Sequence, residues 1–321
     1  MTGAFLTALF FAGNAVCARR AALHFGGTTG NFLRLLLAVA LLAAWAHAAG
    51  QGFGGGVFLW FFVSGAVGFG LGGLTMFHAL PLIGSNLSML IVQCGSAVAA
   101  ALIEWLWLGS RLSAAQAGLA ALALGGVAIG LVGASRRGSP KVAGRVLRTP
   151  PSASAPGVPI RFSLGIALAV ISACAQGGGA VISRKAFGLL RAHGFFMDGA
   201  TSAYQRALGG LAVGTLALLL AGWWPGNQRP PQDDTPSAPA QALPPWIWVV
   251  LNTLLGPVLG VTCYQWALRT NQAGVVLPIV ATAPLLTVPI AWALERSRPT
   301  PRYWIGAGLA VLGVAGLSVA K

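Results

Sequence analysis

Residues 114–134 read AAQAGLAALALGGVAIGLVGA, and this run decides the class of fold. It contains no charged side chain and only one polar side chain, Gln116. A helix that crosses the hydrocarbon core of a membrane needs about 20 consecutive apolar residues. A membrane β-strand would instead alternate apolar and polar residues over about 10 positions. We therefore interpret 114–134 as one transmembrane helix of an all-α integral membrane protein.

The composition extends this interpretation to the whole chain of 321 residues. Hydrophobic residues make up 56% and charged residues only 8%, against about 25% charged residues in a soluble domain. A soluble globular protein is excluded, and so is a disordered chain, which requires low hydrophobicity. The net charge of +15 does not indicate nucleic-acid binding, because the basic residues cluster in the breaks between apolar runs. There they orient a membrane protein and contact anionic lipid, so we expect membrane lipids, and no nucleic acid, as partners.

Ten apolar runs are separated by charged or Pro- and Gly-rich breaks. The first run is expected to be retained, because Arg19 and Arg20 follow it, whereas a secretory signal has its positive charges in front. Four prolines, Pro257, Pro278, Pro284 and Pro289, are expected to interrupt the eighth and ninth spans. The predicted spans are 2–22, 29–49, 57–79, 83–107, 114–134, 162–187, 198–222, 246–268, 272–294 and 302–320.

The two halves of the chain resemble each other. A basic, Pro-rich linker, 135–161, separates a first unit of five spans, 1–134, from a second, 162–321, and a Pro-rich break at 223–245 is expected to be a loop. Matches in sequence order indicate a repeat. Because five spans is an odd number, the second unit must enter the membrane from the opposite side, an inverted design common in secondary transporters that work by alternating access. The aligned stretches are 79–126 on 267–314, 15–21 on 180–186, and Phe32 and Arg34 on Tyr204 and Arg206.

Several short motifs resemble the EamA repeat of the drug/metabolite transporter superfamily. One feature departs from that pattern: the usual Gly-Glu-Arg after the fourth span is Gly109-Ser110-Arg111. The resemblance covers nearly the whole chain except the linker and the 223–245 loop. The residues that carry it are Asn14, Arg19, Phe32-Leu33-Arg34, Phe77-His78-Ala79-Leu80, Ser85-Asn86 and Leu108 to Ser113 in the first unit, and Tyr264 to Leu268, Pro284 and Leu294 to Ser297 in the second.

This resemblance implies ten transmembrane helices around a central cavity, in a monomer of the bacterial inner (plasma) membrane. It also implies export or exchange of a small-molecule substrate, often an amino acid or a related amphipathic metabolite. The cavity walls are expected from the first, third, fourth, sixth, eighth and ninth spans, with the fifth and tenth outside. The charge distribution places the linker in the cytoplasm and both termini outside, whereas the resemblance implies cytoplasmic termini, so the orientation stays open.

Polar side chains within spans are the candidates for substrate binding, because such groups are costly in hydrocarbon unless they are satisfied. They lie in the first, fourth, sixth and eighth spans. Packing between helices is the alternative for the Ser, Asn and Gln residues, and anchoring at the membrane boundary is the alternative for Tyr and Trp. The candidate substrate-binding residues are Asn14, Ser88, Gln93, Gln176, Tyr264 and Trp266.

Basic residues flank the short loops after the first and sixth spans and include Arg34, Arg184 and Arg206. They are suited to attract an anionic or zwitterionic substrate, but extension toward lipid headgroups is the favoured interpretation. Acidic residues are scarce, and none lies at the centre of a span. We therefore expect transport without obligatory proton coupling, with Glu104, near the end of the fourth span, as the one candidate proton carrier.

Two other classes compete with a transporter: an integral-membrane lipid-modifying enzyme and a passive channel. Enzyme chemistry needs paired carboxylates, a metal cluster or a nucleophile with its base, and the only acidic pair, Asp233-Asp234, lies in a Pro-rich loop. A channel would show a selectivity-filter segment or a ring of charges. No two cysteines have metal or redox spacing, so we expect no metal, no cofactor and no catalytic residue.

Overall fold

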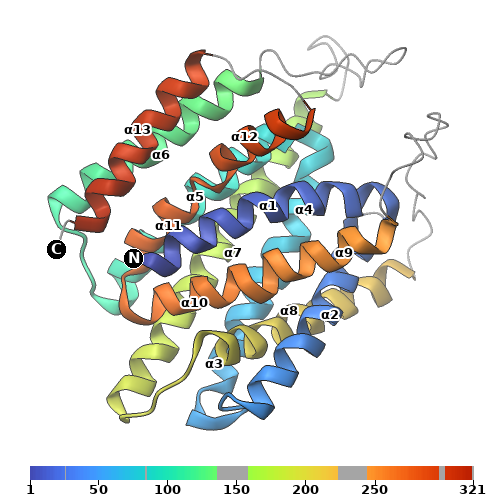
Figure 1. Ribbon diagram of the computed structural model, residues 1–321, viewed down its shortest axis with the longest axis vertical. Helices are drawn as coiled ribbons and strands as arrows, with labels where there is room; N and C mark the ends of the chain where they lie inside the picture. The colour runs from blue at the N-terminus through green and yellow to red at the C-terminus, as the bar shows by residue number, and fades with distance from the viewer. Residues whose placement is uncertain (26, 84, 136–157, 223–243, 296–300, 320–321) are drawn as a thin grey trace.

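The computed structural model describes residues 1–25, 27–83, 85–135, 158–222, 244–295 and 301–319. Every regular element within these ranges is a helix, which confirms the all-α class (Figure 1). Nearly all of the linker 135–161 and of the loop 223–245 lies outside the described residues. The helices are α1 (Thr2–Phe25), α2 (Gly27–Ala48), η1 (Gly54–Gly56), α3 (Phe58–Gly65), η2 (Ala66–Leu71), α4 (Gly72–Ile83), α5 (Ser85–Leu108), α6 (Ala114–Ser135), α7 (Val158–Ala192), α8 (Gly199–Gly222), α9 (Pro245–Thr253), η3 (Leu254–Gly260), α10 (Val261–Thr270), α11 (Ala273–Val280), α12 (Ala283–Glu295) and α13 (Pro301–Val319).

Eight helical stretches in the described part of the chain are long and apolar enough to cross a membrane. Two shorter apolar stretches, Thr2–Ala18 and Ala273–Pro289, occupy the ranges of the predicted first and ninth spans. The eight long stretches are Thr29–Ala48, Phe58–Met76, Leu87–Leu108, Ala114–Leu131, Phe162–Ala192, Gly199–Leu220, Pro245–Thr270 and Pro301–Val319.

Three interruptions shape these spans. The π-helical segment η2 interrupts the third span, and η3, which contains Pro257, interrupts the eighth. The ninth range is not one continuous helix, because α11 ends at Val280 and α12 begins at Ala283. Pro284 lies in the first turn of α12, where its missing N–H leaves no helical hydrogen bond unmade. The π-helical turns of η2 and η3 are wider than those of an α-helix, and such turns are frequent at functional sites.

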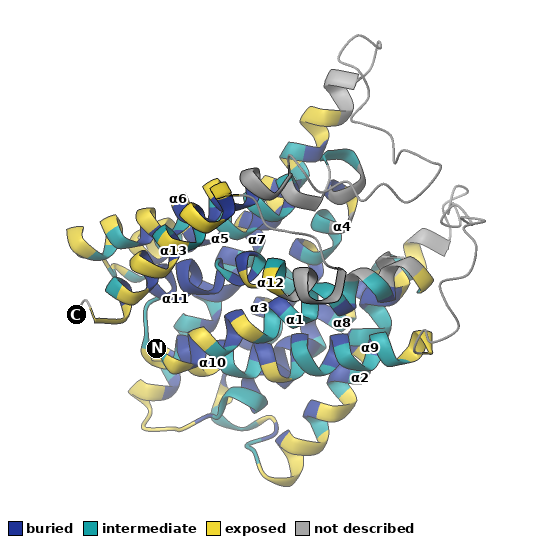
Figure 2. Ribbon diagram, turned by 45° about the horizontal axis from the view of Figure 1, so that its top comes forward, coloured by how far each residue is buried: buried dark blue, intermediate teal, exposed yellow. Residues whose placement is uncertain are grey.

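The helices pack around α7, which contacts α3, η2, α4 and α5 from the first unit. On the other side α1 packs against α9, η3, α10 and α12, while α2 and α3 pack against α8. Exposed residues lie along the outer helices (Figure 2). They include large apolar residues, for example Leu59, Leu106 and Val311, each more than 60% exposed. An apolar surface of this extent fits contact with lipid rather than water.

Helices α6 and α13 form a pair at the edge of the molecule (Figure 1). Glycines let the two backbones touch: a Cβ added at Gly126 would overlap the backbone of Ala310, and one at Gly306 would overlap the backbone of Gly130. Small residues allow this close approach between membrane helices. The neighbouring Gly125 faces open space, with no atom within 4 Å of an added Cβ.

This contrast makes a prediction for stability. Gly126→Ala is expected to cost about 1–3 kcal/mol, because neither backbone can move away from the new methyl group. Gly125→Ala is the matched control and should be neutral or slightly stabilising, since Ala is a better helix former than Gly by about 1 kcal/mol. The apparent melting temperatures of the two detergent-purified variants provide the measurement. Equal losses in both variants would contradict the assigned contact.

Candidate functional site

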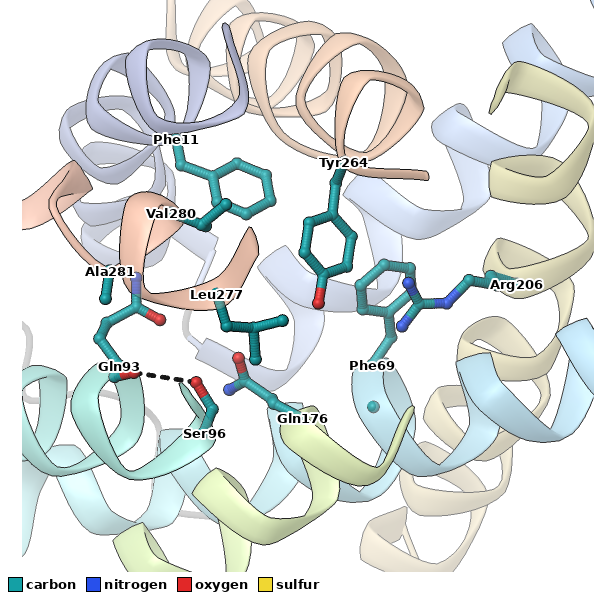
Figure 3. A pocket seen from close by; sticks show the side chains of 11 residues that line it. Phe11, Phe69, Gln93, Ser96, Gln176, Arg206, Tyr264, Leu277, Val280 and Ala281 are labelled. Carbon is teal, nitrogen blue, oxygen red and sulfur yellow. Dashed lines mark hydrogen bonds between the residues drawn. The ribbon is translucent and has the colours of Figure 1, made fainter. Parts of the chain in front are cut away.

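A cavity lies where the two halves of the chain meet, with about 490 Å³ of space not filled by atoms, including its mouth (Figure 3). The walls come from the six spans expected and also from the seventh. The lining residues are Phe11 of α1, Gly68 and Phe69 of η2, Gln93 and Ser96 of α5, Gln176 of α7, Arg206 of α8, Tyr264 of α10, Leu277 and Val280 of α11, and Ala281.

Arg206 is the charged group of this cavity, and it is only 2% exposed. In the orientation that satisfies the Gln265 amide, its oxygen accepts hydrogen bonds from Nη1 and, at 3.2 Å, from Nε of Arg206. The guanidinium carbon lies 4.6 Å from the centre of the Phe69 ring and 5.8 Å from that of Tyr264. Arginine is suited to this setting, because its planar cation stacks on aromatic faces and is weakly hydrated.

A chain of polar contacts holds Gln265 in place behind Arg206. Its amide lies 3.3 Å from Ser183 Oγ, and Ser183 lies 2.8 Å from Ser64 Oγ. Ser64 donates in turn to the carbonyl oxygen of Gly179 at 2.5 Å. These contacts join α3, α7 and α10 and satisfy hydroxyl groups that would be costly to bury alone.

Neutral polar groups complete the cavity. Gln176 donates to Ser172 Oγ at 3.2 Å, and Ser96 donates to the backbone carbonyl of Gln93 at 3.0 Å (Figure 3). The side-chain amide of Gln93 and the hydroxyl of Tyr264 have no hydrogen-bond partner among the described residues. Tyr264, Gln176 and Arg206 point toward one another from three different helices (Figure 3). The cavity therefore offers free donors and acceptors beside one cation.

Three of the six candidate residues, Gln93, Gln176 and Tyr264, line this cavity, and the other three do not. Trp266 is 43% exposed and packs beside Gly3 of α1. It comes two positions after Tyr264, which places it about 200° away around the helix.

Asn14 and Ser88 are the other two candidates outside the cavity. The Asn14 Oδ1 atom lies against Gly256 in η3, where an added Cβ would be 2.6 Å away. Ser88 is fully buried. Both oxygens lack a hydrogen-bond partner among the described residues. Neither residue lines the cavity, and neither makes the hydrogen bond to a neighbouring helix that the packing alternative expects.

The favoured interpretation of Arg206, extension toward lipid headgroups, is wrong, because the side chain is buried and faces the cavity. One signal for this was present in the sequence. Arg206 lies about two helical turns inside a span that is predicted to begin at residue 198. No acidic residue lies within one helical turn of it. The aromatic wall residues Phe11 and Phe69 were missed because they resemble any other apolar residue of a span.

Glu104 lies outside the cavity and is 2% exposed. Its Oε1 atom pairs with Arg184 Nε at 3.0 Å, and its Oε2 atom accepts from the Gly274 N–H at 3.1 Å. Arg184 also donates from Nη1 to the carbonyl oxygen of Leu268 at 3.3 Å. The pair therefore ties α5 and α7 to the end of α10 and the start of α11.

Comparison with known proteins gives one family and one fold. The model of the EamA-like transporter family matches residues 1–132 and 163–319. Among 27 matching chains of solved structures, one crystal structure covers 99% of this chain and 96% of its own, with a TM-score of 0.70 at 18% sequence identity. That likeness shows the shared fold alone. No curated protein matches the chain.

The ion pair predicts a specific instability. Glu104→Gln keeps an oxygen for Gly274 but leaves Arg184 without its counter-charge, which should cost at most about 3–5 kcal/mol. The expected loss lies toward the lower end, because the Arg184 side chain is 15% exposed. Thermal melting of Glu104→Gln, Arg184→Gln and the double variant tests this. The double variant should lose less than the sum of the single losses, and strictly additive losses would contradict the pairing.

Proposed function

Because the chain belongs to the EamA-like transporter family, we propose that it is a secondary transporter that moves small metabolites across the membrane by alternating access. Members of this family are transporters of the drug/metabolite type, not enzymes. The observation that carries the proposal is the cavity, whose polar and aromatic walls come from both halves of the chain. A site between two structural repeats can open to either side when one repeat moves against the other.

The packing supports the inverted-repeat part of the proposal. Numbering the spans from one to ten, the third packs against the seventh as the eighth packs against the second. The fourth packs against the sixth as the ninth packs against the first, and the fifth packs against the tenth. Exchanging the two halves replaces span one by span six, two by seven, and so on. Each contact then becomes a contact that is also present. A two-fold relation between the halves produces this pattern.

Individual residues support the same relation. In the register that aligns 79–126 with 267–314, the first residue of η2, Ala66, falls on the first residue of η3, Leu254. Both interruptions thus lie at equivalent places. Gly65 comes just before η2 and lies against the backbone carbonyl of Arg206. Thr253 comes just before η3 and donates to the backbone carbonyl of Arg34. Arg34 and Arg206 are themselves aligned residues. We infer ten spans on this basis, with Thr2–Ala18 and Ala273–Pro289 as the first and ninth.

The remaining parts of the proposal concern setting and substrate. We place the protein in the bacterial inner membrane as a monomer, with an amino acid or a related amphipathic metabolite as the exported or exchanged substrate. The cavity supports an amphipathic substrate, since Phe11, Leu277 and Val280 provide apolar walls beside the polar groups.

Counterflow in proteoliposomes tests transport. A thermal-shift screen of metabolites against the purified protein first finds a ligand, because a compound that binds the native state raises its apparent stability. Vesicles loaded with that unlabelled compound should then take up the labelled compound faster than empty vesicles do. A passive channel shows no such acceleration, and uptake that ignores the internal load would refute alternating access.

A substitution in the cavity wall provides a second test. A Cβ at Gly68 would lie 3.0 Å from Arg206 Nη2, so the side chain of Gly68→Leu would extend into the cavity. Counterflow should fall at least tenfold while the variant still elutes as a folded protein. Gly188→Leu is the matched control, because an added Cβ at this exposed position of α7 meets nothing within 4 Å. Equal inhibition in both variants would exclude the cavity as the transport site.

Transport is expected to need no proton gradient. Both oxygens of Glu104 are already engaged, by Arg184 and by the Gly274 N–H, and Glu104 does not reach the cavity. An imposed pH gradient should therefore leave the final level of uptake unchanged. Accumulation driven by the gradient alone, and abolished in Glu104→Gln, would overturn this expectation.

A further inference from the structure

The buried cation of the cavity lacks a negative partner. Among the described residues the structure has one ion pair, Arg184 with Glu104, and it does not involve Arg206. The other acidic side chain that the structure describes is Asp198, and it is engaged at the start of α8. Its Oδ1 atom accepts from the Ala200 and Thr201 N–H groups at 2.8 and 2.9 Å, and its Oδ2 atom accepts from the Thr201 hydroxyl. A buried charge without a counter-charge is costly in a membrane and marks a functional site.

The guanidinium of Arg206 also has donors to spare. Arginine carries five N–H groups, and Gln265 accepts from Nε and Nη1 only. The Nη2 atom lies on the cavity side, since a Cβ at the lining residue Gly68 would be 3.0 Å from it. The rings of Phe69 and Tyr264 supply only the partial negative charge of their faces. One planar, donor-rich edge is thus left for an oxyanion.

The rest of the cavity limits which anion fits. No carboxylate and no second cation is among the lining residues. Arginine forms bidentate pairs with both carboxylate and phosphate. A single arginine balances the whole charge of a carboxylate but only part of the charge of a phosphate dianion, so carboxylate is the better match. The remaining polar groups, Gln93, Ser96, Gln176 and Tyr264, are neutral and suit hydroxyl, keto or amine groups of the substrate.

We propose that the cavity recognises substrates by a carboxylate group bound to Arg206, with the apolar body of the substrate against Phe11, Phe69 and Leu277. This inference rests on the proposed transport function and defines the class of substrate. Arg206 is the counter-ion of the substrate, and Tyr264 and Gln176, which face it, are the neighbouring neutral contacts (Figure 3).

Matched ligands test the inference on the wild-type protein. The probes are propionate, hexanoate and phenylacetate, their amides propionamide, hexanamide and phenylacetamide, and the amine phenethylamine. Binding is measured by thermal shift and titration calorimetry in detergent. At least one carboxylate should bind tenfold or more tightly than its own amide. No binding by any carboxylate, or equal binding by an amide or by phenethylamine, would overturn the proposal.

Two further probes separate related chemistries. Phenylalanine carries the same carboxylate with an ammonium group, so its binding relative to phenylacetate distinguishes an amino acid from a simple organic acid, and binding by either supports the carboxylate site. Phenyl phosphate distinguishes carboxylate from phosphate recognition. Tighter binding of phenyl phosphate than of phenylacetate would overturn the carboxylate assignment.

Variants assign the effect to Arg206. Arg206→Gln should weaken carboxylate binding at least tenfold and leave the weak binding of the amides unchanged, and Arg206→Lys should restore part of the affinity. Arg111→Gln is the control, because Arg111 is an exposed arginine that stacks over Trp105 outside the cavity, 5.8 Å from its ring centre. Unchanged carboxylate affinity in a folded Arg206→Gln protein would refute the assignment. If Arg206→Gln does not fold, the wild-type ligand series and Arg206→Lys still decide.

Transport of the tightest probe separates the two proposals. In one outcome, carboxylates bind through Arg206, but neither the bound compound nor any other ligand found by screening shows counterflow. That outcome would leave the carboxylate site intact and refute the transport function. Counterflow of amides or amines, without carboxylate binding, would leave the transport function intact and refute the carboxylate site.

Discussion

The cavity depends on one close crossing of helices, between the third span and α8. A Cβ at Gly65 would overlap the backbone carbonyl of Arg206, and a Cβ at Gly209 would overlap that of Phe62. Lipid tails are as apolar as leucine, so membrane helices gain stability from tight packing of small residues rather than from removing apolar surface from water. Because Arg206 lies at this contact, its side chain reaches Phe69 and Gly68 of η2. Two glycines thus bring a charge into the cavity wall.

The polar network follows from the same crossing. Ser64 comes one residue before Gly65 and bonds to Gly179 of α7, a glycine whose added Cβ would lie 2.8 Å from the Ser64 carbonyl oxygen. Ser183, one turn further along α7, links Ser64 to Gln265. In a medium of low dielectric each of these contacts strengthens the next. Close packing and polar satisfaction therefore position Arg206 together.

Run length and composition were enough to predict the all-α class and the eight stretches that are long enough to cross a membrane, because the hydrocarbon thickness leaves little choice: the range 114–134 became α6, Ala114–Ser135. The site could be predicted only in part. Gln93, Gln176 and Tyr264 stood out as polar groups within spans. The burial of Arg206 depends on contacts with Gly65 and Gln265, which lie far away along the chain, and no local pattern encodes which basic residue of a span faces inward. Nor does local pattern distinguish a cavity aromatic such as Phe69 from one that faces lipid.

The two halves of the proposed repeat differ where the charge lies. Arg34 aligns with Arg206, and in the first half its Nε donates to Asn31 one turn earlier on the same helix, at 2.9 Å. The residue aligned with Asn31 is Ala203, which has no side-chain acceptor, so Arg206 must find its partners on other helices. It finds one amide, Gln265, and two aromatic faces, which orient the guanidinium without neutralising it. In the proposed repeat the two aligned arginines therefore differ in their partners: Arg34 has one on its own helix, and Arg206, which supplies the charge to the cavity, does not.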